Sequence, residues 1–329
     1  MGRVVAVGEM LIDFTALETD TSVLNAGAFT RNPGGAPANV AVAVAKLGQQ
    51  AAFAGCVGED PFGSFLIQTL VTYGVQTEQV FQVPAANTSL AFVARQSGDP
   101  DYFFVRNPGA DVLFGPDLAR QVAISAETIL HFGSNSLAEQ PIREAIMQLV
   151  ERVHQAGAIV SFDVNLRPAF WRGQDGEALT LCRQMVMEAD IVKVNRDELR
   201  WLAGKADIDE GLQVLGAWAP GLLLCTLGSE GAVLSVPDGL DPAARQVHRV
   251  AGFPADCVDA TGAGDACIGA LIAQLLERGV TRQGWATIEP TDWVSMTSFA
   301  CAAAAVNVTR TGAIHAMPVR AEVEALLNQ

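Results

Sequence analysis

Residues 256–277, DCVDATGAGDACIGALIAQLLE, end like a buried helix but begin in an unusual way. Two glycines, an alanine and a carboxylate stand where the helix should start: Gly262, Ala263, Gly264 and Asp265. A helix N-terminus carries unpaired N–H groups and the positive end of the helix dipole. Because glycines let an anion approach that backbone closely, the stretch predicts a cradle for phosphate or for developing negative charge. The plainer alternative is that Asp265 only complements the dipole, although a simple cap requires neither glycine.

Outside this stretch, strand-like and helix-like segments alternate along most of the chain. The apolar runs TILHFGS, AIVSFDVN and IVKVN each precede a longer helical segment. In the N-terminal half, RVVAVGEM is typical of a buried strand, and residues 34–48 and 61–74 are typical of helices. This alternation predicts an α/β fold in which helices cover both faces of a mostly parallel sheet.

Two segments depart from the alternation of strands and helices. Residues 88–106, TSLAFVARQSGDPDYFFVR, alternate like a strand and are interrupted by a turn at Ser97–Gly98–Asp99–Pro100, which predicts a hairpin. Residues 15–32, TALETDTSVLNAGAFTRN, are also strand-like. We expect a small β lid from about residues 14–33 and 88–108, within a single domain that spans residues 1–329.

The composition excludes several classes of partner. Acidic residues outnumber basic ones 36 to 21, for a formal net charge of −15, whereas nucleic acids and anionic membranes require basic surfaces. The six cysteines form no CxxC pair and mostly lie in apolar runs, which predicts buried free thiols in a reducing compartment. The absence of a signal-peptide pattern and of a long apolar run favours a cytoplasmic location. No GxxxxGK[ST] or GxGxxG motif is present, so a Walker site or a dinucleotide-dependent oxidoreductase is disfavoured.

The segment DATGAGD, together with GGAPAN at 34–39, resembles the ribokinase-like (PfkB) family of carbohydrate kinases. The resemblance extends over essentially the entire chain. It implies a three-layer α/β/α sandwich with a mostly parallel central sheet and a small β-sheet lid. It also implies that Asp265 is the catalytic base and that the amides of Ala263, Gly264 and Asp265, after Gly262, form the anion hole for the transferred phosphoryl group. A positioned base typically contributes about 10²–10⁴-fold to the rate.

Three groups near the N-terminus are candidates for binding a sugar. Gly34 and Gly35 would let backbone amides reach sugar hydroxyls, and Asn39 offers both a donor and an acceptor. The alternative is a tight turn with Asn39 facing solvent. Asp13, in GEMLIDF, is a carboxylate that closes an apolar strand. Buried carboxylates require partners, and either two sugar hydroxyls or an interior ion pair would supply them.

The segment SFDVNLRPAFW carries further candidates at the end of a predicted strand. Asp163, Asn165 and Arg167 stand at alternate positions and are therefore expected on one face. In open α/β sheets the ligand crevice lies at the carboxyl ends of the strands. Arg167 is expected to contact the sugar or the moving phosphate, with a surface salt bridge as the alternative, and Asn165 is expected to contact the sugar.

Two segments are candidates for the nucleotide. Asn195 and Glu198, in KVNRDE, have capping-box spacing. The family motif NxxE implies that this glutamate also organises Mg²⁺ and the phosphates through water, and both roles can coexist. In TLGSEG, the resemblance places Thr226, Gly228 and Gly231 near the ATP phosphates and ribose, although the bare sequence predicts only a hairpin turn. The resemblance also places Cys301 beside the nucleotide.

A monovalent cation site is implied by the resemblance in the last part of the chain. Asp259 and Thr261, with the loop NVTRTGAIHA at 307–316, match the region where many family members bind such a cation, largely through carbonyl oxygens. Arg310 and Gly312 are the loop positions that we assign to it. K⁺ is therefore an optional further cofactor.

The acceptor sugar follows from a closer resemblance to the fructokinase branch. Residues 101–114 and 131–137 resemble this branch, in which the lid presents an aromatic ring and an arginine to the sugar. Phe104 and Arg106, two positions apart and thus on one strand face, fit those roles. The resemblance implies ATP-dependent phosphorylation of D-fructose at its 6-hydroxyl, with Mg²⁺ on the β- and γ-phosphates, and a homodimer formed through the lid. The alternatives are 2-keto-3-deoxygluconate, ribose or a riboside as substrate, or a catalytically silent sugar- or nucleotide-binding relative.

Overall fold

A large twisted sheet forms the centre of the molecule. The computed structural model describes residues 2–96, 99–219, 221–238 and 244–329. Within these residues, nine strands pair in the order β13-β12-β11-β10-β9-β8-β1-β4-β5. Neighbours from β11 to β5 are parallel, whereas β12 and β13 add an antiparallel edge. The strands are β1 (Arg3–Val7), β4 (Gln50–Gly58), β5 (Gln76–Val83), β8 (Thr128–Gly133), β9 (Ile159–Asp163), β10 (Ile191–Asn195), β11 (Leu222–Thr226), β12 (Gly231–Pro237) and β13 (Arg245–Ala251).

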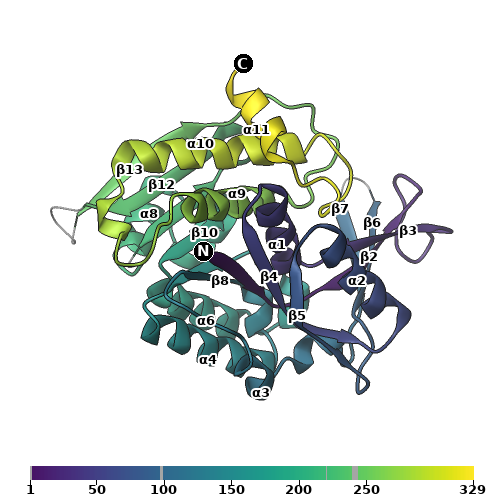
Figure 1. Cartoon of the computed structure of the whole chain (residues 1–329). Helices are drawn as coiled ribbons and strands as arrows, with labels where there is room; N and C mark the ends of the chain where they lie inside the picture. The colour runs from purple at the N-terminus through teal and green to yellow at the C-terminus, as the bar shows by residue number, and fades with distance from the viewer. Residues whose placement is uncertain (1, 97–98, 220, 239–243) are drawn as a thin grey trace.

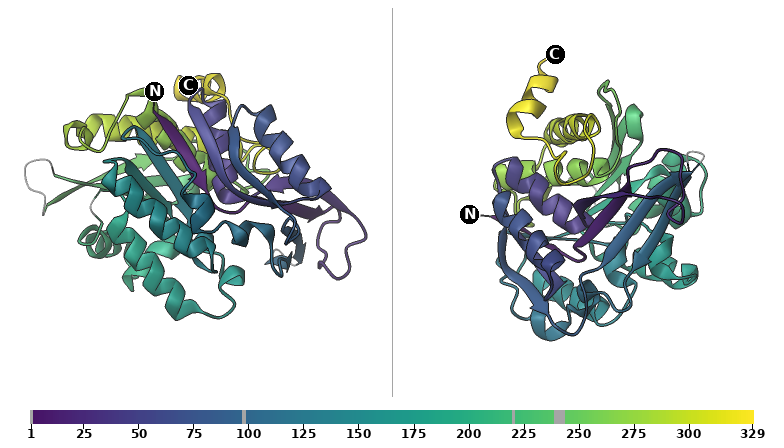
Figure 2. Two further views of the ribbon diagram at one scale, coloured as in Figure 1. Left: turned by 60° about the horizontal axis from the view of Figure 1, so that its bottom comes forward. Right: turned by 90° about the vertical axis from the view of Figure 1, so that its right-hand side faces the viewer.

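Helices cover both faces of this sheet (Figure 1). One layer contains α1 (Ala36–Lys46), α2 (Pro61–Thr72), α9 (Ala263–Glu277), α10 (Pro290–Asn307) and α11 (Arg320–Leu327). The other contains α3 (Pro116–Ala119), α4 (Ile142–Gln155), α6 (Asp175–Glu188), α7 (Arg196–Ala203) and α8 (Ile208–Gly216), and the short α5 (Pro168–Trp171) follows β9. Two views of the ribbon show the sheet between the two helical layers (Figure 2). The predicted three-layer α/β/α architecture with a mostly parallel sheet is confirmed.

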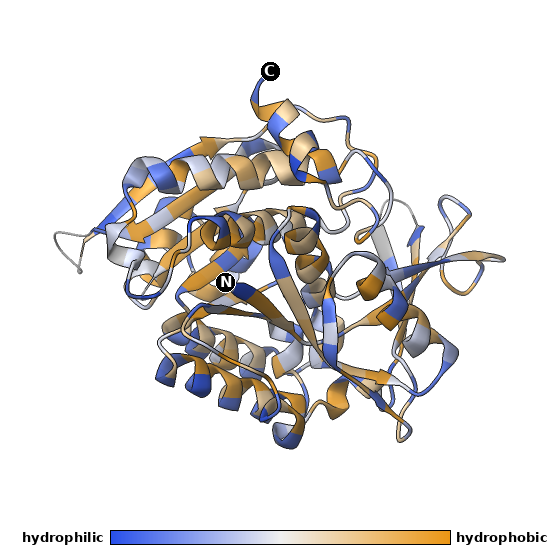
Figure 3. Cartoon of the chain, in the orientation of Figure 1, coloured by the Kyte–Doolittle hydropathy of each residue, from blue (hydrophilic) through white to orange (hydrophobic). Residues whose placement is uncertain are grey.

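Burial on both faces explains the composition of the central strands. All six residues of β8 are buried, and so are Ile191–Val194 of β10. The central strands are mostly hydrophobic, whereas hydrophobic and hydrophilic residues alternate along the covering helices (Figure 3). Helix α9 is apolar all round because α1 and α10 both pack against it. The first turn of α9 therefore lies deep in the molecule.

A second, smaller sheet lies beside the large one (Figure 1). In the described residues it has the strand order β3-β2-β6-β7, from β2 (Leu11–Ala16), β3 (Phe29–Gly34), β6 (Leu90–Gln96) and β7 (Asp99–Val105). The rings of Phe14 and Phe92 stack at a centroid distance of 5.0 Å and help to hold the sheet together. That this sheet acts as a lid stays a prediction.

The structure corrects two expectations about this small sheet. Strands β6 and β7 form the expected antiparallel hairpin, but Asp99 and Pro100 belong to β7 and pair with Gln96 and Arg95, rather than lying in the turn. Ser97–Gly98 lie outside the described residues. Of the strand-like stretch at 15–32, only residues 15–16 and 29–32 lie in strands; a loop joins them.

Cysteine burial and helix length agree with the composition. All six cysteines lie in the described residues as free thiols; five are buried, and Cys257 is exposed. Among the described helices, none combines the length and the apolar character that a membrane span requires.

Candidate active site

The two glycine-rich segments of the sequence meet at the first turn of α9. The side-chain amide of Asn39, in α1, donates to Asp265 Oδ2 at 2.7 Å, and both residues are buried. The Oδ1 atom of Asn39 is buried and has no partner in the described part of the chain. The alternative in which Asn39 faces solvent is therefore wrong. The unpaired oxygen is an acceptor that a ligand hydroxyl can satisfy.

The electrostatic surroundings of Asp265 suit proton transfer. Burial raises the pKa of Asp265 to about 6, the hydrogen bond from Asn39 lowers it, and the nearby charge of Asp163 raises it. The cations of Lys193 and Arg167 lower this pKa. Because an efficient general base has a pKa near the working pH, this carboxyl is a candidate base.

The backbone before Asp265 requires glycine and leaves amides free. Gly262 has a φ of +81°, in the left-handed region that disfavours other residues. The amide of Ala263 donates to the carbonyl of Ala260 at 3.2 Å. The amides of Gly264 and Asp265 have no acceptor among the described residues. Of the three amides expected to form the anion hole, those of Gly264 and Asp265 are thus free in the described structure, whereas that of Ala263 already has an acceptor.

Asp13 lies on the small sheet rather than at the end of an apolar strand of the large one. Strand β1 ends at Val7, Gly8 follows with a φ of +147°, and a new strand begins at Leu11. Burial raises the pKa of Asp13 to about 7, and Arg167 lowers it. The Asp13 carboxylate has no hydrogen bond or ion pair within the described residues, so the interior ion pair is absent there. A Cβ on Gly34 would lie 2.0 Å from Asp13 Oδ2, so glycine at this position makes room for the carboxylate.

Arg167 reaches the site by a different route from the expected one. Strand β9 ends at Asp163, Asn165 has a φ of +33°, and Arg167 is the N-cap of α5. The expectation that Asp163, Asn165 and Arg167 lie on one strand face is therefore wrong, because the strand ends at Asp163. The exposed Arg167 guanidinium nevertheless lowers the pKa of both Asp13 and Asp265 through its charge.

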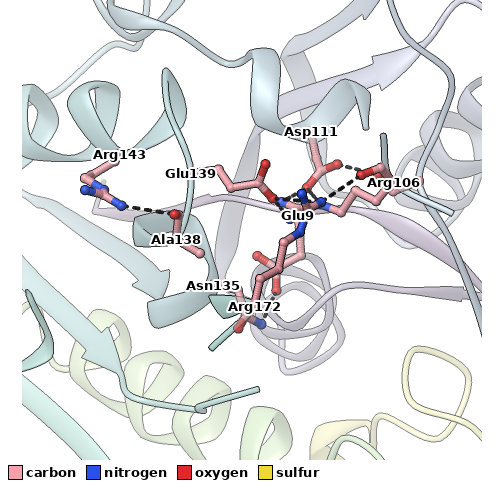
Figure 4. Close-up of polar contacts among 9 residues, drawn as sticks. Glu9, Arg106, Asp111, Asn135, Ala138, Glu139, Arg143 and Arg172 are labelled. Carbon is pink, nitrogen blue, oxygen red and sulfur yellow. Dashed lines mark hydrogen bonds and ion pairs between the residues drawn. The ribbon is translucent and has the colours of Figure 1, made fainter. Parts of the chain in front are cut away.

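Arg106 is held within an ion-pair cluster (Figure 4). Its Nε and Nη2 donate to Asp111 Oδ2 at 2.9 and 2.6 Å, and its Nη1 donates to Glu139 at 2.8 Å. Strand β7 ends at Val105, so Arg106 lies one residue beyond the strand. The side chains of Phe104 and Arg106 still meet at Phe170, with the guanidinium 4.6 Å and the Phe104 ring 4.9 Å from its ring centroid. Contact of either with a sugar stays a prediction.

The capping box before α7 is present. Asn195 Oδ1 accepts from the amides of Asp197 and Glu198 at 2.9 and 2.8 Å, and Glu198 Oε2 accepts from the amide of Asn195 at 2.8 Å. Glu198 Oε1 also accepts from the amide of Leu166 at 2.9 Å, which ties α7 to the segment after β9. The further role of Glu198 toward a nucleotide stays a prediction.

The other residues expected to contact the nucleotide lie in the turn after β11 and on helix α10. Thr226 ends β11, and Gly228 and Gly231 have φ values of +64° and +100° in the hairpin to β12. The short 3₁₀ segment Gly228–Glu230 forms this turn. Cys301 lies on α10, where its thiol is hydrogen-bonded to that of Cys267 on α9.

Asp259 joins the two loops that were expected to share a cation. Its Oδ1 accepts from the amide and hydroxyl of Thr261 at 3.0 and 2.7 Å, and its Oδ2 accepts from the amide of Gly312 at 2.9 Å. The side chain of Arg310 is paired with Glu322 of α11. In the described residues, no three His, Cys, Asp or Glu side chains form a cluster that could hold a metal ion. A monovalent cation bound by loop carbonyls stays a prediction.

Two buried ionisable side chains, those of Lys193 and Glu9, were missed by sequence reasoning. Lys193 Nζ lies 2.9 Å from both carboxylate oxygens of Asp163, and both side chains are buried. A lysine in the middle of the apolar strand IVKVN was the available signal. Glu9 was also missed; its Oε1 accepts from Asn135 at 3.2 Å, and burial raises the pKa of its carboxyl (Figure 4).

The raised pKa of Asp265 leads to a prediction about stability. Because the pKa of Asp265 in the folded chain, about 6, exceeds the ordinary aspartate value of 3.8, ionisation opposes folding. The loss of stability begins as the pH rises through the pKa of Asp265 in the unfolded chain. It is complete once the pH exceeds the pKa of Asp265 in the folded chain. Asp265→Asn removes it and should raise Tm at alkaline pH by about 2–5 °C, with little change at about pH 4. Thermal unfolding at the two pH values measures this, and an unchanged or lower Tm at alkaline pH would contradict it.

Comparison with known proteins places this site within a family of carbohydrate kinases. The model of the pfkB family carbohydrate kinase matches residues 1–320. Fructokinase-2 of Solanum lycopersicum is 38% identical over 330 residues, covering 99% of this chain and 96% of that protein. The crystal structure of fructokinase with bound ATP from Xylella fastidiosa has a TM-score of 0.86 and 33% identity, covering 99% of this chain and 98% of that chain. The fructokinase of Vibrio cholerae O395, in a fructose-, ADP- and calcium-bound form, has a TM-score of 0.86 and 31% identity, with 99% of each chain covered.

Proposed function

The chain belongs to the pfkB family of carbohydrate kinases, and from this premise we propose that it transfers the γ-phosphate of ATP to the 6-hydroxyl of D-fructose. The observation that carries the proposal is the hydrogen bond between Asn39 and Asp265, because it brings both glycine-rich segments to one buried point. Curated fructokinases and solved fructokinase structures match nearly the whole chain, which supports fructose as the acceptor, although an aminoimidazole riboside kinase structure covers as much of it.

The proton of the acceptor hydroxyl goes to Asp265. As the hydroxyl oxygen forms its bond to the γ-phosphorus, the bond from that phosphorus to the β-γ bridging oxygen breaks, and ADP leaves. Asn39 holds the Asp265 carboxylate in place through its 2.7 Å hydrogen bond. A base held in this way deprotonates the alcohol only as the phosphoryl group arrives.

Negative charge on the transferred group is met by the first turn of α9. The free amides of Gly264 and Asp265 point out of a helix N-terminus, where the dipole favours an anion. Arg167 adds a cation that acts on both carboxyls of the site. Because these donors are already in place, they stabilise the transition state without reorganisation.

The residues present fit a nucleotide whose metal ion is held mainly by phosphates and water. Mg²⁺ usually takes one or two carboxylates plus substrate phosphates, and no cluster of three acidic side chains occurs in the described residues. We assign contact with its water shell to Glu198, whose carboxylate oxygens also accept from the amides of Asn195 and Leu166. When bound, Mg²⁺ would supply charge neutralisation on the β- and γ-phosphates. K⁺ near Asp259 is proposed as an optional further cofactor.

We propose that the sugar is recognised by acceptors that have no hydrogen-bond partner among the described residues. Asn39 Oδ1 is buried, so a hydroxyl that fails to reach it leaves a buried polar atom unpaired, and the half-buried Asp13 carboxylate is the second such acceptor. We assign further contacts with the sugar to the backbone around Gly34 and Gly35; a Cβ on Gly34 would lie 2.0 Å from Asp13 Oδ2. The small sheet carries Asp13 and Phe104, so we infer that it acts as a lid over the sugar and, through its outer face, as the contact of a homodimer.

Activity should depend on pH through these two carboxyls. Asp265 must be ionised to accept a proton, and Asp13 must be ionised to accept from two hydroxyls; their pKa values are about 6 and about 7. We expect kcat/KM for fructose to rise with pH from about 5 to about 8 and then level off. A profile measured with saturating ATP tests this. A flat profile down to about pH 5 would contradict the assignment of both groups.

The acceptor is tested by a coupled ADP-release assay over a panel of substrates. The panel contains fructose, ribose, 2-keto-3-deoxygluconate, adenosine and an aminoimidazole riboside. We expect fructose to give the highest kcat/KM and fructose 6-phosphate to be the product. A higher kcat/KM for any other sugar would overturn the specificity and leave the kinase reaction in place.

A further inference from the structure

Lys193 is a buried cation in the centre of the large sheet. It is the third residue of β10, which lies between β9 and β11, and its side chain is 4% exposed. The flanking residues Val192 and Val194 are fully buried in an apolar cluster. Placing a charged group there is costly unless it is paired, so the position calls for an explanation.

The ammonium group of Lys193 is surrounded by carboxylates from three elements. It lies 2.9 Å from both oxygens of Asp163, at the end of β9. Burial alone would lower the pKa of Lys193, but Asp163, Glu198 and Asp265 together raise it above its usual value. The side chain therefore stays charged across the working pH range and exchanges no proton during the reaction.

The same ammonium group lies directly against the first turn of α9. A Cβ added to Gly264 would be 3.0 Å from Lys193 Nζ and 3.4 Å from its Cε. This contact favours glycine at position 264, because an added Cβ would press against the end of the Lys193 side chain. It also places a fixed positive charge behind the amides of Gly264 and Asp265, the two donors of this turn that have no acceptor in the described chain.

Fold stability alone is a weak reason for this ion pair. Replacing a buried pair by apolar side chains of similar volume is often neutral or stabilising, whereas removing one partner is costly. A fixed charge at a point where negative charge develops is, in contrast, an effective way to stabilise a transition state.

We propose that Lys193 is a positioning residue for phosphoryl transfer: anchored by Asp163, it holds the first turn of α9 and adds a positive charge behind the amides that receive the γ-phosphate. The inference rests on the proposed function, because it requires the phosphate to reach this turn. The proton still goes from the sugar hydroxyl to Asp265, and the phosphorus–oxygen bonds form and break as described above.

The charged and polar groups that face Asp265 come from four elements. They are Asn39 of α1, Asp163 of β9, Lys193 of β10 and Arg167 at the start of α5. If only Lys193 is removed, the negative charge of Asp163 is no longer neutralised, and the pKa of Asp265 rises. The acid limb of the pH profile of kcat therefore moves to higher pH. Removing both partners largely cancels this shift, because the two charges act in opposite directions.

The test compares Lys193→Met with the double variant Asp163→Asn/Lys193→Met. We expect Lys193→Met to lower kcat about 10- to 100-fold, to change KM for fructose by less than about threefold, and to move the acid limb upward. In the double variant, Tm and the pH profile should return toward those of the original chain, while kcat stays low. Arg282→Met is the matched control, because Arg282 pairs with Asp190 at 3.0 Å, at the opposite end of β10, and its loss should leave kcat unchanged.

Recovery of full kcat in the double variant would overturn the proposal, since it would show that Lys193 only neutralises Asp163. A Lys193→Met variant with kcat within about threefold of the original would do the same. If Lys193→Met does not fold, kcat of the double variant alone tests the proposal: a low kcat supports it, and full kcat overturns it. Failure of the proposed function is recognised separately, because the unmodified chain would then lack fructose kinase activity or Asp265→Asn would retain it.

Discussion

Asp265→Asn is expected to lower kcat for the phosphorylation of fructose by about 10²–10⁴-fold, with little change in KM for either substrate. Asparagine has the same shape and keeps the contact with Asn39, but it cannot take the proton of the hydroxyl. Its neutral amide also removes the ionisation that opposes folding, so the variant should be at least as stable as the original chain. The ADP-release assay measures kcat, and thermal unfolding verifies the fold.

Asp190→Asn is the matched control for this variant. Asp190 is also a buried carboxyl whose pKa is raised by burial, but it precedes β10 at the amino end of the strands, away from α9. Its replacement should leave kcat within a small factor. If Asp265→Asn retains more than about a tenth of the original kcat, the general-base role is wrong.

Asp13→Ala is expected to lower kcat/KM for fructose by about 10²–10⁴-fold, mostly through KM. Each hydrogen bond from a hydroxyl to a charged acceptor contributes about 1.5–3 kcal/mol, and the proposed contact has two of them. Binding of ATP does not involve Asp13, so KM for ATP should change little. Steady-state kinetics with each substrate varied in turn separate the two effects.

Gly34→Ala tests the same contact from the opposite side. Its Cβ would lie 2.0 Å from Asp13 Oδ2 and would displace the carboxylate, so we expect the same loss of fructose affinity. Gly176→Ala is the control, because a Cβ at that position meets nothing within 4 Å. Unchanged kcat/KM in Asp13→Ala would show that the carboxylate does not bind the sugar.

The layers of the fold and the glycine-rich start of α9 could be predicted from the sequence. Apolar runs such as TILHFGS are long enough and apolar enough to show that both faces of the sheet are covered. The start of α9 was recognisable because Gly262 and Gly264 are conspicuous ahead of an apolar helix. Local sequence carries this information, since burial and helix capping act over a few residues.

The partners of charged side chains and the local turns of the backbone were not apparent from the sequence. Arg106 is held by Asp111 and by Glu139, and nothing in the sequence says which acidic residue a given arginine will meet. The turn that takes Arg167 out of β9 depends on the positive φ of Asn165, which the alternation of side chains does not reveal. In both cases the residue type indicated a candidate site residue, but the sequence did not reveal the local geometry.

Lys193 was missed for a related reason. A lysine between two valines in a predicted strand is a visible anomaly, but its meaning comes from Asp163 on the neighbouring strand and from Gly264, 71 positions later in the sequence. Only the assembled sheet brings these groups together.

The central claim is that phosphoryl transfer occurs at the first turn of α9, and a crystal structure of this chain with fructose and a non-hydrolysable ATP analogue tests it most directly. The account predicts that the fructose 6-hydroxyl lies about 2.6–3.2 Å from a carboxylate oxygen of Asp265. It also predicts that the terminal phosphate accepts from the amides of Gly264 and Asp265. A terminal phosphate turned away from residues 262–265, or a different sugar hydroxyl facing Asp265, would contradict it.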